Sequence, residues 1–532
     1  MNYIKIKFLI GFMSLGLITT FISCNDDLDE VNINPNEPEI VPTNTIFNSA
    51  TRYLMYNTRD EWWSGRLTLP WMQYSAQYIY VEEDKYQYRE TQAENGWSYM
   101  YRSAQNFKSL IDFCESPETS AQMAGYGNID NQIAVSRIML AYTFDQLTSH
   151  FGDVPYWSYG DRENPNFQAL QILEYFQPKY ASQQEIYTDI LNELKEASQQ
   201  LVLDEDVFIS GDNIYGGDAS KWKKFANSLR LRIANRIKTV YPEATSHISD
   251  AIASGVFTSN DDSAIQSFFS GSVEASPYWS SFFVDNRTDF AVNAQFVYLL
   301  KGETGNFGLD PRLQKMVAPI GLTREQVTNG SYSETDDLTQ YVGMPYGLPG
   351  DRTNANGNLE NTSFVSSFVL NPSYGEPLME YSEVEFILSE LNNWDQTHYE
   401  NGVRASMEKW GVDGSDIDAY VSSLPAANQE NVLSQKYISL YMQGAEAWND
   451  YRRTGYPNTD ILLLPGESSV ELDGTPYVFT PLVSGSVIAT DIPNRVRYPQ
   501  SEYSTNTSSV QEAVDHLNHG DEIDSKLWWD VN

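Results

Sequence analysis

Residues 219–242 have the sequence ASKWKKFANSLRLRIANRIKTVYP, which is the clearest helical pattern in the chain. Its apolar residues recur every three or four positions, the spacing that places side chains on one face of an α-helix. They are Trp222, Phe225, Leu229, Ile233 and Ile237. The run ends at Tyr241-Pro242, because a proline disfavours helical backbone at the residue before it. The pattern predicts a long amphipathic helix over residues 219–240.

The same periodicity predicts helices on both sides of this stretch. These helices are expected over residues 97–115, 129–149 and 183–201, then from Val384 to Leu391, from Gly402 to Trp410 and from Ile438 to Trp448. Paired helices of this length are typical of a helix-pair solenoid, although the sequence has no strict repeat of about 34 residues. The predicted fold class is mainly α, a superhelix of helix pairs.

Two long stretches, residues 257–375 and 453–510, break the helical pattern. Both are rich in Gly, Ser, Asn, Thr and Pro, so we expect loops with short strands at most. Loops of this length on a helical scaffold are usually where ligands bind. Within a body spanning residues 43–532, we therefore expect a helical core from residues 43–256 and 376–452. The two irregular stretches would form a second, loop-rich ligand lobe.

The N-terminus has the pattern of an export signal. Lys5 and Lys7 precede an apolar run from Phe8 to Ile22, which is shorter than the roughly 20 residues of a membrane-spanning helix. Residues 21–24, Phe-Ile-Ser-Cys, resemble a bacterial lipobox. We expect residues 1–23 to be a removed signal peptide and Cys24 to carry the lipid anchor. The alternative is an ordinary secretory signal with a chance cysteine. Residues 24–42 are acidic and Pro-rich, which predicts a flexible tether.

Composition excludes one broad class of partner. Without Lys5 and Lys7 the chain has 32 basic and 72 acidic residues, a net charge of −40, which repels nucleic acid. Aromatic residues make up 13% of the chain, enough for large cores. If Cys24 is acylated, Cys114 has no intramolecular partner, so packing and not disulfides must stabilise the fold.

Seven cations and no acid occupy residues 221–238, which makes this helix unusual in an acidic chain. They are Lys221, Lys223, Lys224, Arg230, Arg232, Arg236 and Lys238. One interpretation is an anion-binding site. We favour the other, in which these side chains pair with carboxylates of neighbouring helices, and we extend it to Arg452-Arg453.

Local signatures of catalysis are missing from the sequence. There is no Gly-x-Ser-x-Gly, no His-Glu-x-x-His, no P-loop and no dinucleotide-binding motif. Of the five histidines only His516 and His519 lie close together, which is weak support for a metal site. A further alternative is a pair of carboxylates like that of a glycosidase, because a chain with 72 acidic residues could bring two of them together in space. The expectation is a protein that is not an enzyme.

No cofactor is expected, with structural calcium as an open alternative. Acid-rich loops could bind this ion, but they lack the spacing of an EF-hand, so we interpret them as solvated turns. The candidate acids are Asp204, Glu205, Asp206 and Asp212 in one loop, and Asp261 and Asp262 in another.

Two irregular segments, residues 62–88 and 278–289, are crowded with aromatic residues. Aromatic rings stack on the C–H faces of sugars, while Arg and Asp side chains bond the hydroxyl groups. We expect about two thirds of these rings to be buried, Trp71 and Tyr74 among them. The candidate ligand-binding residues are Trp62, Trp63, Tyr78, Tyr80, Tyr86, Tyr278, Trp279, Phe283, Arg287 and Asp289.

A set of motifs spread over the chain resembles the SusD/RagB family. They are His150–Tyr156 (HFGDVPY), the helix Trp222–Ile237, Asp310–Leu313 (DPRL), Glu383–Glu390, Gly402–Met407, Gln435–Tyr437 with Trp448–Gly455, and Ile492–Arg495 with Tyr498-Pro499. They follow the family's order over nearly the whole chain after residue 24. These motifs lie on predicted helices and turns and look structural. Ligand residues vary among members and cannot be transferred by motif.

The resemblance implies a tetratricopeptide-like helical body with a second, irregular lobe. It also implies a surface-exposed outer-membrane lipoprotein that covers a TonB-dependent (SusC-like) transporter and captures oligosaccharides for import. The acidic run after Cys24 is similar to the surface-export signal of such lipoproteins. Because the family includes peptide importers, a peptide ligand is the main alternative. A surface glycoside hydrolase and a pure assembly subunit are the others.

Overall fold

The computed structural model describes residues 40–271, 273–351, 361–458, 460–483 and 490–531. Residues Met1–Pro42 and Thr43–Asn532 form separate units. The predicted signal peptide, Cys24 and most of the predicted tether lie outside the described residues. Among the described helices, none has both the length and the apolar character needed to cross a bilayer.

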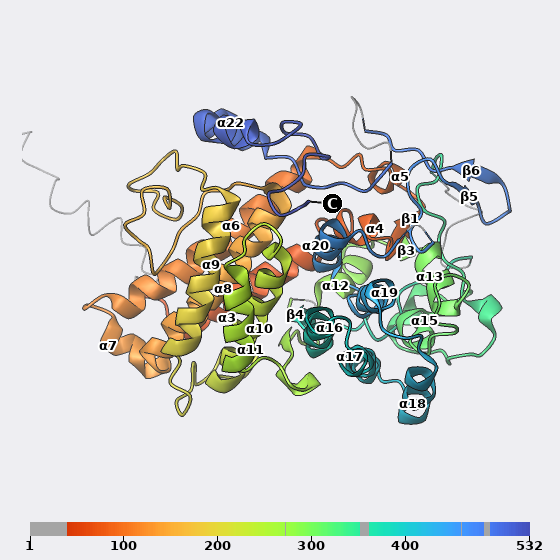
Figure 1. Ribbon diagram of the computed structural model, residues 1–532, viewed down its shortest axis with the longest axis horizontal. Helices are drawn as coiled ribbons and strands as arrows, with labels where there is room; N and C mark the ends of the chain where they lie inside the picture. Colours follow the sequence, from red (N-terminus) through yellow and green to blue (C-terminus); the bar gives the residue numbers. More distant parts are fainter. Residues whose placement is uncertain (1–39, 272, 352–360, 459, 484–489, 532) are drawn as a thin grey trace, which may run out of the picture. The chain divides into compact units, whose positions relative to one another are not determined.

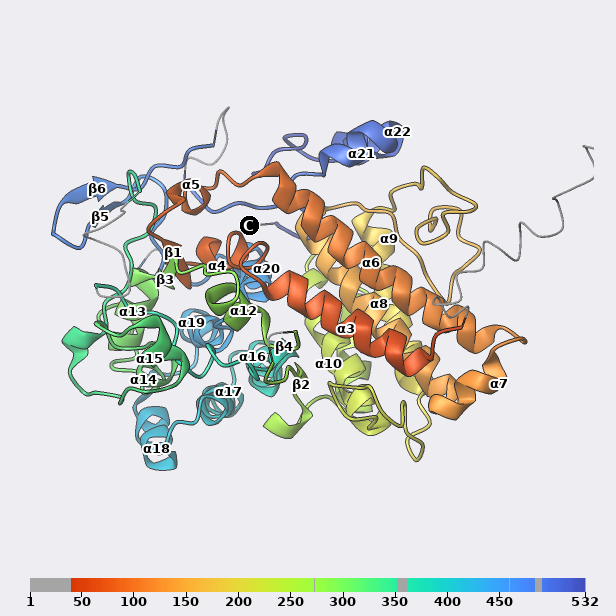
Figure 2. The same ribbon diagram turned by 180° about the vertical axis from the view of Figure 1, so that it is seen from behind.

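The first half of the larger unit is a row of long helices, each packed against the next (Figures 1 and 2). In chain order they are α3 (Thr43–Arg59), α6 (Glu90–Glu115), α8 (Ile129–Phe151), α9 (Gln183–Gln200), α10 (Ala219–Ile237) and α11 (Ala244–Ser254). Shorter helices interrupt the row: α4 (Thr68–Trp71), α5 (Val81–Asp84) and α7 (Ser120–Met123). The four helices predicted in this half are confirmed, and α3 and α11 are additional.

A second group of helices follows in the C-terminal half. It consists of α16 (Tyr381–Leu391), α17 (Gln396–Lys409), α18 (Gly414–Ser423), α19 (Gln429–Ser439) and α20 (Gly444–Thr454). The α16 helix packs on α17 and α19, and α10 contacts α16, so α10 joins the two groups (Figure 1). This succession of packed helices confirms the predicted mainly α fold of helix pairs.

Charge pairing explains why the cation-rich α10 can occupy this central position. Trp222, Phe225 and Leu229 are fully buried on one face. Five of the seven predicted cations pair with carboxylates, as the sequence predicted. These pairs are Lys224–Asp262 (2.8 Å), Arg230–Asp250 (2.9 Å), Arg232–Glu383, Arg236 with Asp145 (2.6 Å) and Glu446 (2.7 Å), and Lys238–Glu390 (2.8 Å). Because Asp145, Glu383 and Glu446 belong to α8, α16 and α20, these pairs hold three other helices to α10.

The single helix predicted from Ile438 to Trp448 is wrong, because the chain breaks between α19 and α20. Met442 has a φ of 71°, in the left-handed region that ends an α-helix. At Gly444 a Cβ atom would lie 2.7 Å from the backbone of Thr68, so only glycine allows α20 to approach α4 this closely. The apolar periodicity continues across the break because both helices face the same core.

The core between the two groups is aromatic. Trp71 and Trp448 meet edge to face with ring centroids 5.0 Å apart, and Tyr74 stacks on Tyr437 at 4.6 Å. The predicted burial of Trp71 and Tyr74 is confirmed, at 0% and 1% exposure. Cys114 is also buried, which raises the pKa of its thiol to about 12. Its thiol is therefore inert, and packing stabilises this part of the chain.

Residues 257–375 and 453–510 contain short helices, whereas the sequence predicted only loops and strands. They are α12 (Pro277–Phe283), α13 (Ala294–Lys301), α14 (Leu313–Met316), α15 (Arg324–Thr328) and α21 (Gln500–Thr505), and α22 (Thr507–Asp515) follows. None of these helices exceeds nine residues, so none produces a sustained helical period in the sequence.

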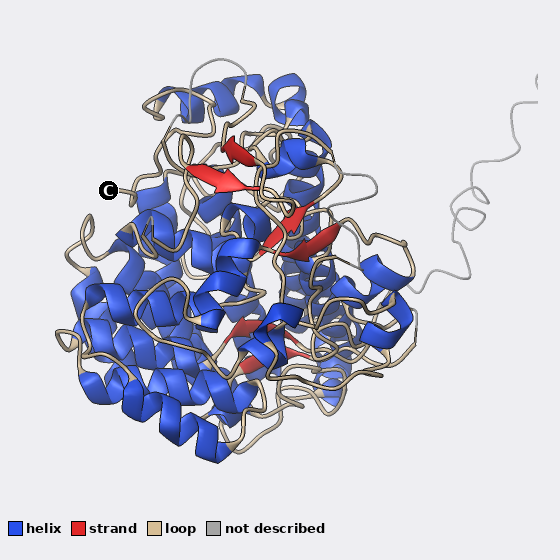
Figure 3. Cartoon of the chain, turned by 90° about the vertical axis from the view of Figure 1, so that its right-hand side faces the viewer, coloured by secondary structure: helices blue, strands red, loops and turns tan. Residues whose placement is uncertain are grey.

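Three small antiparallel pairs are the sheets of the described residues (Figure 3). β1 (Ser75–Gln77) pairs with β3 (Phe290–Val292), β2 (Ala264–Gln266) with β4 (Glu376–Met379), and β5 (Ser468–Val470) with β6 (Pro476–Val478). The first pair matters for function because Gln77 lies opposite Phe290. The pairing of β1 with β3 brings the two aromatic segments predicted to bind ligand, residues 62–88 and 278–289, next to each other.

Candidate ligand-binding surface

Three of the predicted ligand residues form one cluster after α3. Trp62 and Tyr80 are half-buried, and the guanidinium of Arg287 lies 4.9 Å from the ring centroid of Trp62 and 5.9 Å from that of Tyr80. A second guanidinium, that of Arg89, lies 5.3 Å from the ring centroid of Tyr80. Segments more than 200 residues apart in the sequence thus meet in a layer of rings and guanidinium groups.

A buried arginine supports this cluster from below. Arg66 is fully buried and pairs with Glu83 and with Asp289, the latter at 3.3 Å. Its guanidinium also lies 5.0 Å from the Trp62 ring and 5.2 Å from the Tyr80 ring. Asp289, a predicted ligand residue, is itself buried and therefore anchors Arg66 in this structure. Arg66 in turn fixes the positions of both rings.

Helix α12 extends the cluster with a second pair of rings. Trp279 and Phe283 stack with centroids 5.3 Å apart and planes within 12°, and the guanidinium of Arg324 lies 5.2 Å from the Phe283 ring. The backbone N–H of Arg287 donates to the backbone carbonyl of Ser281 at 2.9 Å, and this bond connects α12 to the first cluster. Figure 2 shows α12 next to the end of α3 and close to β1 and β3. We call Trp62, Tyr80, Trp279 and Phe283 the aromatic surface.

The other predicted rings belong to the protein interior. Trp63 is 2% exposed and packs on His150 and Phe151, and Tyr86 is 1% exposed and meets Phe479 edge to face. Tyr78 and Tyr278 are also buried. Burial raises the pKa of the Tyr278 hydroxyl, and the nearby carboxylates of Asp289 and Glu61 raise it further. These four rings support the site from inside and present little surface to a ligand.

Two tyrosines that the sequence analysis missed lie beside the aromatic surface. Tyr53 and Tyr56 are half-buried on α3 and line a cavity of about 330 Å³ together with Arg52. Burial raises the pKa of Tyr56, and the carboxylate of Asp285 beyond α12 raises it further. A helical wheel would have found them, because the buried residues Phe47, Ala50, Leu54 and Thr58 of α3 leave positions 53 and 56 on the outer face.

Two buried carboxylates hold the turn that presents Trp62. Asp60 accepts backbone N–H bonds from Trp62 (3.0 Å) and Trp63 (2.9 Å), and Glu61 accepts the Ser281 hydroxyl. Burial raises the pKa of both acids, and repulsion between them raises that of Asp60 further. Their bonds give them a structural role, which is to fix the turn and join it to α12.

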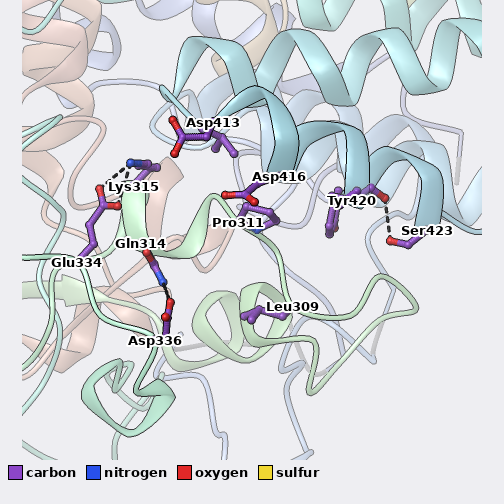
Figure 4. A pocket seen from close by; sticks show the side chains of 12 residues that line it. Leu309, Pro311, Gln314, Lys315, Glu334, Asp336, Asp413, Asp416, Tyr420 and Ser423 are labelled. Carbon is purple, nitrogen blue, oxygen red and sulfur yellow. Dashed lines mark hydrogen bonds and ion pairs between the residues drawn. The ribbon is translucent and has the colours of Figure 1, made fainter.

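A larger cavity, about 490 Å³, lies between α14 and α18 (Figure 4). Its polar groups bind each other: Lys315 pairs with Glu334 at 2.8 Å, and Gln314 donates to Asp336 at 3.0 Å. Its one aromatic residue, Tyr420, is buried and donates its hydroxyl to Asp310. With no exposed ring in its wall, this cavity is a poor platform for a sugar.

Two of the acids considered for calcium, Asp212 and Asp262, are engaged by protein donors. Asp212 accepts the Trp222 indole N–H at 2.8 Å and the Gly217 N–H at 2.9 Å, and Asp262 pairs with Lys224. His516 and His519 each bind a different carboxylate, on Asp153 and Asp524. Within the described ranges, no group of three His, Cys, Asp or Glu side chains could hold a metal ion.

We expect calcium removal to leave stability unchanged. A cation that binds only the folded state raises the melting temperature, but the carboxylates of Asp212 and Asp262 already have donors within the protein. Thermal unfolding in excess EDTA and in millimolar calcium measures this directly. A higher melting temperature in calcium, reversed by the chelator, would contradict the expectation.

Comparison with known proteins identifies the family. A family model described as "Starch-binding associating with outer membrane" matches residues 35–473. A second model, described as "Susd and RagB outer membrane lipoprotein", matches residues 425–530. The chain belongs to the SusD-like family. It is therefore an outer-membrane lipoprotein, as the resemblance of its motifs implied. A search of curated protein sequences found no match.

Solved structures agree with the fold of this SusD-like protein. One named a chitin-binding protein is 25% identical, with a TM-score of 0.69, over 91% of this chain and 100% of that one. A chitin-binding SusD homologue from Flavobacterium johnsoniae is 22% identical, with a TM-score of 0.69, over 91% and 99%. A SusD homologue from Bacteroides uniformis is 23% identical, with a TM-score of 0.67, over 92% and 99%. These likenesses confirm the tetratricopeptide-like helical fold.

Proposed function

We propose that this SusD-like protein is a non-catalytic binding protein of the cell surface that captures an oligosaccharide and delivers it to a TonB-dependent transporter. The observation that carries this function is the aromatic surface, where rings from residues 62–80 and 279–283 lie together and remain partly exposed. Exposed rings flanked by polar groups suit the alternating C–H faces and hydroxyl groups of a sugar chain. The chitin-binding activity named for two proteins of the same fold supports a glycan ligand.

The anchor completes this proposal. We infer that residues 1–23 are removed, that the Cys24 thiol is acylated, and that residues 24–42 tether the binding body to the membrane. Acyl chains contribute about 0.8 kcal/mol per buried CH₂, so two or more chains would hold the protein stably at a membrane. The irregular stretches 257–375 and 453–510 would form the ligand lobe of this body. Mass spectrometry of the mature N-terminal peptide tests the lipid on Cys24.

Calorimetry with panels of oligosaccharides and oligopeptides tests the ligand class. We expect heat of binding with glycans, and binding of peptides alone would replace the glycan by a peptide cargo. Incubation with polysaccharide, followed by analysis of released sugars, tests the absence of catalysis. Accumulating products would favour a glycoside hydrolase. Co-purification with the transporter but without binding of any small ligand would leave only an assembly role.

A further inference from the structure

Arg287 differs from most arginines of this protein in having no carboxylate partner among the described residues. Its guanidinium contacts the rings of Trp62 and Tyr80, at 4.9 and 5.9 Å, and its side chain is partly exposed. Asp289, two residues further on, pairs with the buried Arg66 instead. Asp285 is exposed and lies beyond ion-pair distance of Arg287. The N–H donors of Arg287 are therefore available to a ligand.

This availability is unexpected in a chain with 72 acidic and 34 basic residues. Arg137, Arg453 and Arg495 each pair with a carboxylate within 3 Å, at 2.9, 2.7 and 2.6 Å. An excess of acids makes such pairing easy, so an unpaired guanidinium at a binding surface needs a separate explanation.

Two further arginines without an ion pair in the described ranges lie at the same place. Arg52 lines the cavity beside Tyr53 and Tyr56 and donates to the Val273 carbonyl. Arg324 lies over the Phe283 ring and donates to the Asn286 side chain and the Phe282 carbonyl. Both bind neutral oxygens, so no carboxylate of the described residues offsets their charge. Three partly exposed guanidinium groups thus border the aromatic surface without carboxylate partners in the described chain.

We propose that the glycan captured on this surface is acidic, carrying carboxylate or sulfate groups, and that Arg287 binds one of these groups. This inference rests on the proposed glycan-binding function. A guanidinium presents a planar set of donors that matches a carboxylate or sulfate with two parallel hydrogen bonds. Contact with the rings of Trp62 and Tyr80 restricts the orientation of Arg287, so less side-chain entropy is lost on binding. The sugar rings of the glycan stack on the neighbouring aromatic residues, and Arg287 favours glycans that carry a negatively charged group.

The negative charge of the whole protein does not prevent this selection. The charge of −38 repels anions at long range, but salt screens that repulsion beyond about 8 Å at physiological ionic strength. The buried acids near this surface are already bonded within the protein: Asp289 pairs with Arg66, Asp60 accepts the Trp62 N–H, and Glu61 accepts the Ser281 hydroxyl. A direct contact with a partly buried guanidinium is screened much less than the long-range field.

Matched pairs of oligosaccharides test the proposal with the full mature protein. One pair is an oligogalacturonate and its methyl ester, and the other is a sulfated galactan oligosaccharide and its desulfated form. A glycan array carrying these and neutral oligosaccharides, followed by calorimetry, measures the preference. Charge-assisted hydrogen bonds predict that at least one charged form binds roughly tenfold to a hundredfold more tightly than its neutral counterpart. Comparison of the two pairs shows whether carboxylate or sulfate is recognised.

Variants at position 287 assign the preference to a residue. Arg287→Gln is expected to lower the affinity for the charged form to that of its neutral counterpart, with both measured on the same variant, and its melting temperature shows whether the fold is retained. Arg287→Lys keeps the charge but loses the planar donors, so it should retain part of the preference. Arg404→Gln is the matched control, because Arg404 pairs with Asp418 on the surface of α17 and α18.

Two results would overturn the inference in distinguishable ways. If neutral glycans bind as tightly as their charged counterparts, or Arg287→Gln keeps the preference, the acidic ligand is wrong while the glycan-binding function stands. If no glycan binds at all, the proposed function itself fails and this inference fails with it.

Discussion

Replacement of Trp62 and Trp279 together by alanine is expected to weaken oligosaccharide binding at least a hundredfold. Both rings are partly exposed, and they come from the two clusters that form the aromatic surface. Truncation of a central aromatic residue in a binding site typically costs about 2 kcal/mol or more, and every 1.4 kcal/mol is a factor of ten in affinity. Each single variant should therefore lose at least tenfold. Calorimetry with the best oligosaccharide from the panel measures the loss.

The control for this result is an exposed ring elsewhere. Phe176 is 78% exposed on the loop between α8 and α9, so Phe176→Ala should bind like the wild type. Melting temperatures of all variants show whether folding is retained. Unchanged affinity in a folded double variant would place the ligand away from the aromatic surface.

Replacement of Arg236 by methionine is expected to destabilise the protein by about 3–5 kcal/mol, the cost of breaking a buried ion pair by removing one partner. Arg236 is 3% exposed and binds Asp145 at 2.6 Å and Glu446 at 2.7 Å, so it joins α10 to α8 and α20. Burial alone would raise the pKa of Glu446, but the guanidinium groups of Arg236 and Arg232 lower it to about 2. In the variant, Asp145 stays buried without its cation.

Lys223→Met is the matched control, because Lys223 belongs to the same helix, is only partly buried and has no ion pair among the described residues. Its effect should stay within about 0.5 kcal/mol, as for most surface substitutions. Urea unfolding followed by circular dichroism compares the two variants. Equal stability of Arg236→Met and the wild type would show that α10 does not depend on these pairs.

The long helices could be predicted from the sequence, because a helix with one buried face has apolar residues every three or four positions. This period predicts the helix of residues 219–240, and five of its seven cations pair with acids, as expected. The break at Met442 could not be predicted, because it depends on the close approach of Gly444 to Thr68, a contact between residues far apart in the chain. Short helices such as α12 are too brief to show a period.

The candidate site was only partly predictable for a different reason. The aromatic segments 62–88 and 278–289 were identified from composition, and the β1–β3 pairing brings them together. Composition does not distinguish the buried ring of Trp63 from the partly exposed ring of Trp62 next to it. That difference depends on Gly96, where a Cβ would lie 2.1 Å from the Trp63 ring and exclude it. Likewise, composition does not show that Arg287 and Arg324 lie at this surface without a carboxylate partner among the described residues, because that depends on contacts made in the folded chain.

A crystal structure of the mature protein with a bound oligosaccharide would show where and how the ligand binds. We expect an intact sugar chain lying across Trp62, Tyr80, Trp279 and Phe283, with an acidic group of the sugar at Arg287. A sugar bound in the cavity between α14 and α18, or one cleaved in the crystal, would contradict this expectation.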